Sequence, residues 1–239
     1  MGLESVRLIT FDCYGTLIDW ETGLLQALRP LFAAAGRAIP DVELLALYGE
    51  IEAELETAPY LPYRDVMART AQAMGQRLGA TISADDGNAF ADSLAGWEPF
   101  PDTVAALQSL SRRFTLGIIS NVDDDSFAKT QKKLQVSFAV IVTAEQVQSY
   151  KPALKNFQEM LRRSGLPKEE VLHAGQSVYH DIIPTTILGI KNVWVNRPSI
   201  RPGVGAVRRA SNRPVYEVHS LAELAGLLET EGGPGQATI

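Results

Sequence analysis

Residues 6–17 read VRLITFDCYGTL, and this stretch decides how the rest of the chain is interpreted. Its apolar first half, with β-branched side chains, predicts a buried strand that ends at Asp12, and Gly15 marks the turn that follows. Ligands of open parallel sheets bind at the carboxyl ends of the strands, so a carboxylate here is placed to face a ligand. The glycine lets the backbone turn sharply and direct amides at an anion. An aspartate that only caps a turn gives the same pattern, so this stretch alone does not decide the function.

Four more apolar runs follow along the chain and predict further strands. They alternate with stretches of helical spacing, such as residues 103–110 and 154–163. This alternation predicts an α/β fold, a doubly wound parallel sheet with helices on both faces. The predicted strands after the first are residues 114–120, 139–143, 171–174 and 192–195.

The long stretch between the first two strands has helical periodicity and little strand character. An insertion at this point predicts a helical cap over the carboxyl ends of the strands, where ligands bind. We therefore expect residues 21–99 to form a cap domain and residues 1–20 and 100–239 to form the catalytic core. The apolar positions that recur at helical spacing are Leu24, Leu25, Leu28 and Leu31, and then Met67, Ala71 and Met74.

The composition narrows the classes of function. The chain has 239 residues and a formal net charge of −6, with no long basic run, which disfavours nucleic acid and a membrane surface as partners. The single cysteine, Cys13, excludes an internal disulfide and suits a reducing compartment. The apolar run at the start is too short for a signal peptide or a membrane span. Together these features predict a cytoplasmic protein.

Polar side chains follow the later strands at the points where those strands are expected to end. Ser120 and Asn121 follow one strand, and Asp181 comes shortly after another. Lys151 precedes a proline, and a proline at a first helical position would place this lysine near a helix N-terminus, where its charge is disfavoured. In a parallel sheet these groups converge on the crevice beside Asp12. A lysine between two carboxylates offsets their repulsion.

In these four segments the chain resembles the haloacid dehalogenase superfamily, and the match spans essentially the whole chain. Asp12 with residues 15–17 is similar to the first motif of that family, and residues 120–121 are similar to its second. Residues 151–152 are similar to the third motif, and Asp181 to the fourth. The resemblance implies a Rossmann-like core with a helical cap inserted after the first strand. It also implies attack by the Asp12 carboxylate on the substrate, giving an enzyme ester that water then cleaves.

The resemblance also implies roles for the other motif residues. Lys151 is expected to orient Asp12 and to neutralise charge. Ser120 and Asn121 are expected to bind the anionic group of the substrate. Asp181 is expected to hold the lysine, a metal ion or a water. The implied partner is a small anionic substrate, and the oligomeric state found among many relatives is a homodimer.

Two positions distinguish the branches of the superfamily. Its phosphatases resemble one another in having a second aspartate two residues after the nucleophile, as a general acid, and here that residue is Tyr14. A halide leaves without a proton, so this form is similar to that of the 2-haloacid dehalogenases. Gln176 stands where the phosphatases usually have a metal-binding acid, and its neutral amide binds Mg²⁺ less well. The further side chains expected to bind substrate are Tyr14, Thr16, Gln176, Phe157 and His180.

The favoured function is therefore cofactor-free hydrolysis of a carbon–halide bond in a small 2-substituted carboxylate, but three departures leave alternatives open. Residues 47–55 contain no arginine to receive a halide, and Phe157 replaces a tyrosine. Val178 and His180 stand where dehalogenases have an asparagine and a tryptophan. One alternative is a Mg²⁺-dependent phosphatase of small phosphate esters, with Asp12 and Asp181 as metal ligands. Another is a binding protein that has lost catalysis.

The cap is rich in acids, which bears on the choice between these functions. Residues 22–99 contain five arginines, no lysine and eleven acids. This excess of acids disfavours a multiply charged phosphate substrate, unless the acids lie on a solvated face. Glu50, Glu52, Glu54 and Glu56 are expected to be surface residues.

Overall fold

The sheet at the centre of the molecule consists of six parallel strands. The structure, a computed structural model, describes residues 2–211 and 214–230, and its strand order is β3-β2-β1-β4-β5-β6. The predicted doubly wound parallel sheet is confirmed, and the last strand was not predicted. The strands are β1 Leu8–Phe11, β2 Thr115–Ser120, β3 Val140–Thr143, β4 Val171–Gly175, β5 Lys191–Val195 and β6 Tyr216–Val218.

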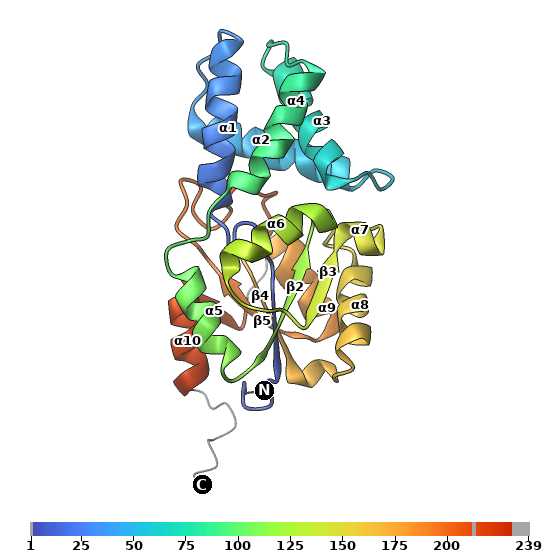
Figure 1. The fold of residues 1–239 in the computed structure, drawn as a ribbon, viewed down its shortest axis with the longest axis vertical. Coiled ribbons are helices and arrows are strands. Elements are labelled where there is room, and N and C mark those ends of the chain that lie inside the picture. Colours follow the sequence, from blue (N-terminus) through green and yellow to red (C-terminus); the bar gives the residue numbers. More distant parts are fainter. Residues whose placement is uncertain (1, 212–213, 231–239) are drawn as a thin grey trace.

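Helices cover both faces of this sheet (Figure 1). Helices α5 and α10 pack together on one face with α6 beside α5, and α8 and α9 pack together on the other. Every residue of β1 is buried, because both faces of this central strand are covered. The helices of the core are α5 Thr103–Ser111, α6 Asp124–Leu134, α7 Ala144–Val147, α8 Leu154–Ser164, α9 Ile183–Leu188 and α10 Leu221–Thr230.

The cap is helical and stands beyond one end of the sheet, next to the carboxyl end of β1 (Figure 1). The leucines predicted to share a helix face are buried at 24, 25 and 28 and partly buried at 31, and the methionines at 67 and 74 are also buried. The helical cap after the first strand is therefore confirmed, and the division into two domains with the bounds given above stays a prediction. The cap elements are α1 Trp20–Ala34, α2 Asp41–Glu56, α3 Tyr63–Arg77, α4 Ala84–Asp92 and the short 3-10 helix η1 Ser93–Gly96.

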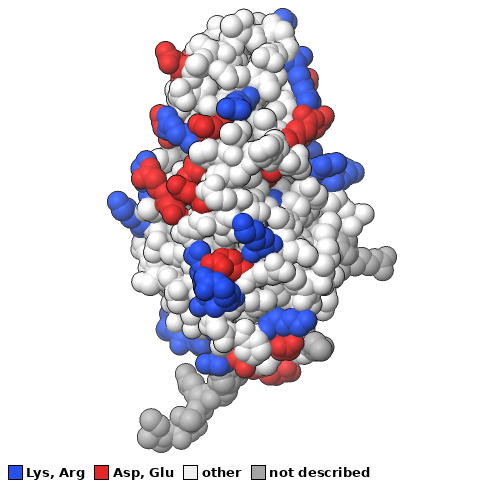
Figure 2. All heavy atoms as spheres, turned by 90° about the vertical axis from the view of Figure 1, so that its right-hand side faces the viewer, with Lys and Arg blue, Asp and Glu red and all other residues white. Residues whose placement is uncertain are grey.

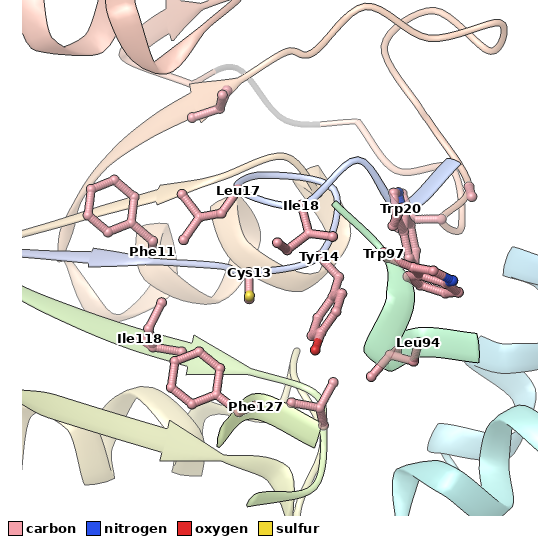
Figure 3. Packing of buried hydrophobic residues seen from close by; sticks show 14 of the residues in the cluster. Phe11, Cys13, Tyr14, Leu17, Ile18, Trp20, Leu94, Trp97, Ile118 and Phe127 are labelled. Carbon is pink, nitrogen blue, oxygen red and sulfur yellow. The ribbon is translucent and has the colours of Figure 1, made fainter. Parts of the chain in front are cut away.

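Two chain segments join the cap to the core, and they run side by side. The amide of Asp19 donates to the carbonyl of Glu98, and the amide of Phe100 donates to the carbonyl of Leu17. Aromatic and aliphatic side chains fill this junction, with the ring of Tyr14 edge-on to Trp97 (Figure 3). Cap and core therefore share one continuous apolar cluster, which includes Cys13.

Charged side chains lie mainly on the outer surface. On the face shown in Figure 2, acidic and basic groups are intermingled and neither sign forms one continuous patch. Within the part of the chain that the structure describes, no helix combines the length and the apolar character needed to cross a membrane.

Candidate active site

Asp12 directly follows β1, and hydrogen bonds to its backbone and to both side-chain oxygens fix its position. Its backbone amide donates to the carbonyl of Ala174 on the neighbouring strand. Thr16 donates to Asp12 Oδ2 at 2.7 Å, and the Thr16 hydroxyl in turn accepts from the amide of Gln176 at 2.9 Å. The turn between Asp12 and Thr16 requires Gly15, which has φ +94°, where any side chain would also meet the ring of Trp20.

Lys151 lies between the two acids, as the charge argument from the sequence predicts. Its ammonium donates to Asp12 Oδ1 at 2.8 Å and to Asp181 Oδ1 at 2.7 Å, and its side chain is only 2% exposed. Burial lowers the pKa of Lys151, but the two carboxylates outweigh this effect and raise it, so the lysine stays charged. Burial raises the pKa of Asp12, and the lysine opposes that shift. One fixed cation thus balances two buried carboxylates.

The fourth motif brings Asp181 to the same point through an unusual turn. Residues Val178–Ile182 form a π-helical turn, in which Ser177 caps the backbone amide of His180. The Nε2 atom of His173, a buried residue of β4, lies 3.1 Å from Asp181 Oδ1. Burial raises the pKa of Asp181, but Lys151 and His173 together hold it below its usual range. Asp181 is therefore a carboxylate that positions the lysine.

The backbone around Lys151 differs from the prediction. Pro152 is not at a first helical position, because α8 begins only at Leu154, and the Lys151–Pro152 peptide is cis. The prediction that Pro152 occupies a first helical position is therefore wrong, and Lys151 lies three residues before the first residue of α8. Its charge is stabilised by the two acids, and its backbone amide donates to Asn121 Oδ1 at 2.7 Å.

The two polar side chains of the second motif differ in their hydrogen bonding: that of Asn121 is fully hydrogen-bonded, and that of Ser120 is not hydrogen-bonded to any described residue. The amide nitrogen of Asn121 donates to the carbonyl of Lys151 and to Glu56 Oε1, both at 3.1 Å. With both amide protons used and its oxygen accepting from Lys151, Asn121 has no donor left for the expected substrate anion. Ser120 Oγ is buried, faces the pocket and makes no hydrogen bond with any described residue. Ser120 is therefore the side chain of this motif that is free to receive a substrate.

Seven of the ten predicted site residues line one pocket between core and cap, and three do not. Thr16 donates a hydrogen bond to Asp12 but is fully buried and does not line the pocket. The amide of Gln176 turns away and donates to the carbonyl of Val204. Phe157 lies in a second apolar cluster under α8, edge-on to His173. These three side chains are not placed for the predicted contact with a substrate in this pocket. The seven that line it are Asp12, Tyr14, Ser120, Asn121, Lys151, His180 and Asp181.

The cap contributes acids to this pocket, which the sequence interpretation missed. Glu50 and Glu54 are exposed, as expected, and form ion pairs with Arg77. Glu52 and Glu56 instead face the pocket. The expectation that all four glutamates lie on the surface is therefore wrong for two of them. The side chains share α2, where 100° per residue sends positions 52 and 56 to the opposite face from 50 and 54. Tyr48, four residues before Glu52 on the same helix face, is fully buried, but its burial is not evident from the sequence.

Hydrogen bonds and burial set the charge of these cap acids. The hydroxyls of Tyr48 and Tyr63 both donate to Glu52 Oε1, at 2.8 and 2.7 Å. Burial, together with the charge of Glu56, raises the pKa of Glu52 to about 8. Burial raises the pKa of Glu56 to about 8 as well, against the hydrogen bond from Asn121. Both carboxyls hold their protons over much of the neutral range.

The enclosed space is small. The cavity has a volume of about 40 Å³. A water needs roughly 10–15 Å³ on this measure, so the cavity holds about three waters. A substrate larger than this enters only when cap side chains move away from the core.

Comparisons with known proteins identify the family of this chain. A family model described as haloacid dehalogenase-like hydrolase matches residues 6–184. The chain belongs to this family. It is 26% identical over 234 residues to an (S)-2-haloacid dehalogenase of Pseudomonas putida, covering 95% of this chain and 98% of that enzyme. It is 27% identical over 195 residues to a phosphoglycolate phosphatase of Photorhabdus laumondii, covering 78% and 79%.

The fold of this haloacid dehalogenase-like hydrolase is shared with solved structures. The L-2-haloacid dehalogenase of Xanthobacter autotrophicus superposes with a TM-score of 0.79 at 17% identity, covering 93% of this chain and 98% of that one. A similarity at this identity establishes the Rossmann-like core with its cap, and leaves the substrate to the residues of the pocket.

The donor set of this hydrolase fits Mg²⁺ poorly. Both oxygens of Asp12 already accept hydrogen bonds, from Lys151 and Thr16. Asp181 Oδ1 accepts from Lys151, and its Oδ2 accepts from the amide of Ser177 at 3.3 Å. Across residues 2–211 and 214–230, no group of three or more His, Cys, Asp or Glu side chains is arranged to hold a metal ion. Hard cations prefer several free oxygen ligands, and the oxygens of Asp12 and Asp181 are already engaged in hydrogen bonds.

Proposed function

We propose that this hydrolase forms a covalent ester on Asp12 without a metal ion, and that its substrate is a small 2-substituted carboxylate such as a 2-haloacid. The observation that carries the proposal is the Lys151 ammonium, 2.8 Å from Asp12 Oδ1. This fixed cation favours the ionised form of Asp12 against the effect of burial, so a carboxylate nucleophile is kept in a closed pocket. An idle site has no need to hold two acids and a lysine in this way.

The first half of the reaction needs only groups that the pocket supplies. The Asp12 carboxylate attacks the carbon that bears the halogen, a C–O bond forms as the carbon–halogen bond breaks, and the halide leaves with the bonding pair. No proton is required, which agrees with Tyr14 at the position of the phosphatase acid. The Tyr14 hydroxyl is bonded to Thr130 at 2.7 Å, and burial raises its pKa well above the usual range. Ser120 Oγ is free to bind the substrate carboxylate.

The similarity to enzymes named (S)-2-haloacid dehalogenase supports carbon–halide cleavage, because it extends over 95% of the chain. The similarity to a phosphoglycolate phosphatase supports the alternative, a Mg²⁺-dependent phosphatase. The poor fit of the Asp12 and Asp181 oxygens to Mg²⁺ favours the first of these functions.

The test is chloride release from (S)-2-chloropropanoate, measured with and without EDTA. We expect the wild-type protein to release chloride at the same rate in both conditions. The Asp12→Asn variant should fold normally and release none, because an amide is not a nucleophile of this kind. Chloride release by Asp12→Asn would refute the ester mechanism. Absence of chloride release by the wild type, with phosphate released from small esters on addition of Mg²⁺, would establish the alternative.

A further inference from the structure

A carboxyl of the cap and an imidazole of the core meet at the pocket, and neither has an assigned role. Glu56 Oε2 lies 3.5 Å from His180 Nε2. Neither atom makes a hydrogen bond within the described ranges, although the two side chains are only 5% and 10% exposed. Both line the same cavity as Asp12. Buried polar atoms without partners are rare and mark a place where another molecule is expected to bind.

The second polar atom of each side chain, Glu56 Oε1 and His180 Nδ1, is held by a neighbour, and this sets the direction in which Glu56 Oε2 and His180 Nε2 point. Asn121 donates to Glu56 Oε1, so only Oε2 is free. Ser177 Oγ lies 3.1 Å from His180 Nδ1 and also accepts from the His180 amide, so only Nε2 is free. The two free atoms therefore have one orientation each, toward one another and the cavity.

Hydrolysis of an ester on Asp12 needs a proton acceptor, and the fourth-motif acid is poorly suited to that task. Asp181 is fully buried and already accepts hydrogen bonds from Lys151 and Ser177. Its pKa lies below the usual range because Lys151 and His173 outweigh the effect of burial. A general base needs a free acceptor atom and works best when its pKa is near the operating pH. Glu56 Oε2 and His180 Nε2 are both free, and the pKa of Glu56 is raised to about 8.

We propose that Glu56 and His180 form the proton-transfer pair that activates the hydrolytic water, an inference that rests on the ester mechanism proposed above. The oxygen of the water bonds to the carboxyl carbon of the Asp12 ester, and one water proton passes to the pair. The bond from that carbon to the substrate oxygen then breaks, and the departing oxygen takes the second proton. Asp12 is regenerated as a carboxylate, the product is an alcohol, and the pair releases its proton to solvent.

Several charged and titratable groups face the pair and set its pH dependence. Glu52 of α2 and Tyr63 of α3 come from the cap, and Lys151, Asp12 and Asp181 come from the core. Tyr150 also lies within electrostatic reach of Glu56. Burial raises the pKa of Glu56 to about 8 and lowers that of His180. The accepting form, ionised Glu56 beside neutral His180, therefore grows as the pH rises to about 8, and ester hydrolysis should accelerate over this range.

The test separates the two half-reactions in the full-length protein by single turnover with (S)-2-chloropropanoate. Chloride and lactate are measured, and the ester is detected on intact protein by mass spectrometry. In Glu56→Gln we expect a burst of about one chloride per site, accumulation of the ester, and lactate formation slowed roughly 100-fold or more. His180→Asn should behave alike, so a folding defect in one variant leaves the other as a test. Glu54→Gln, an exposed position on the same helix, is the matched control and should behave as wild type.

The pH profile is a second readout, which a purely structural role would not change. The wild-type rate of ester hydrolysis should rise to about pH 8, and Glu56→Gln should lose this dependence. Ester hydrolysis at the wild-type rate in Glu56→Gln and His180→Asn would overturn this inference and leave the ester mechanism intact. Absence of ester and chloride in every variant, with the wild type included, would overturn the proposed function and this inference together.

Discussion

Replacing Lys151 by methionine removes the one cation between two buried acids, and it should destabilise the fold in a pH-dependent way. The side chains of Lys151, Asp12 and Asp181 are 2%, 11% and 0% exposed. Removing one partner of such a buried pair typically costs about 3–5 kcal/mol, because the remaining charges lose their compensation. We expect the free energy of unfolding of Lys151→Met to fall by roughly that amount at pH 8.

The sign of the pH dependence follows from the direction of the pKa shifts. In the wild type, Lys151 holds the pKa of Asp181 below its usual range, so that contribution to stability is present above the usual pKa and is lost only in acid. In Lys151→Met, burial acts unopposed by the lysine and raises the carboxyl pKa values. The folded variant then binds protons more tightly than the unfolded chain, and its stability falls as the pH rises. The destabilisation should therefore be smaller at pH 5.5 than at pH 8.

Urea unfolding followed by circular dichroism at the two pH values measures this difference. Lys129→Met is the matched control, because Lys129 forms an exposed ion pair with Asp125. This substitution should change the free energy of unfolding by less than about 1 kcal/mol. A loss below about 1 kcal/mol in Lys151→Met, equal at both pH values, would refute the claim that the lysine balances the acids.

Two further substitutions test the surroundings of the acids. Thr16→Val removes the hydroxyl that donates to Asp12 Oδ2. We expect steady-state kinetics to show kcat lowered roughly 10-fold, because the nucleophile is less well aligned. Urea titration should show the free energy of unfolding lowered by about 1–3 kcal/mol. Unchanged kcat would mean that this hydrogen bond does not align the nucleophile. Gly175→Ala places a Cβ 2.5 Å from Asp181 Cγ. This clash should lower the free energy of unfolding by about 1–3 kcal/mol and therefore lower the Tm. An unchanged Tm would contradict the tight contact.

The sequence predicted the core of the site because the rules for parallel sheets are simple. Five apolar runs became strands, and their carboxyl ends brought Asp12, Ser120, Lys151 and Asp181 together. The sixth strand, Tyr216–Val218, has three residues and too little pattern to stand out from a loop. Phe157 was wrongly predicted to bind substrate. Its spacing from the lysine does not reveal that it lies on the face of α8 that packs in an apolar cluster against the sheet.

The cap side of the pocket was not predictable from the same rules. A run of glutamates at every second position is typical of a solvated helix, and only the packing of α2 against the core decides which of them are buried. Tyr48 and Glu52 share a face at helical spacing, but the sequence does not indicate that this face meets the core. Long-range packing, rather than local pattern, therefore selects Glu52 and Glu56.

The side-chain amide of Asn121 links the nucleophile side of the pocket to the cap. Two of its hydrogen bonds hold the backbone of Lys151 within the core, and the third crosses to Glu56 in the cap. Of these three bonds, only the one to Glu56 joins the two parts of the molecule. A movement of the cap away from the core would therefore separate Glu56 from His180 and leave Lys151 beside Asp12. In the proposed scheme an open molecule retains its nucleophile but lacks its water-activating pair. In that scheme the ester on Asp12 would be hydrolysed only while Glu56 and His180 are in contact.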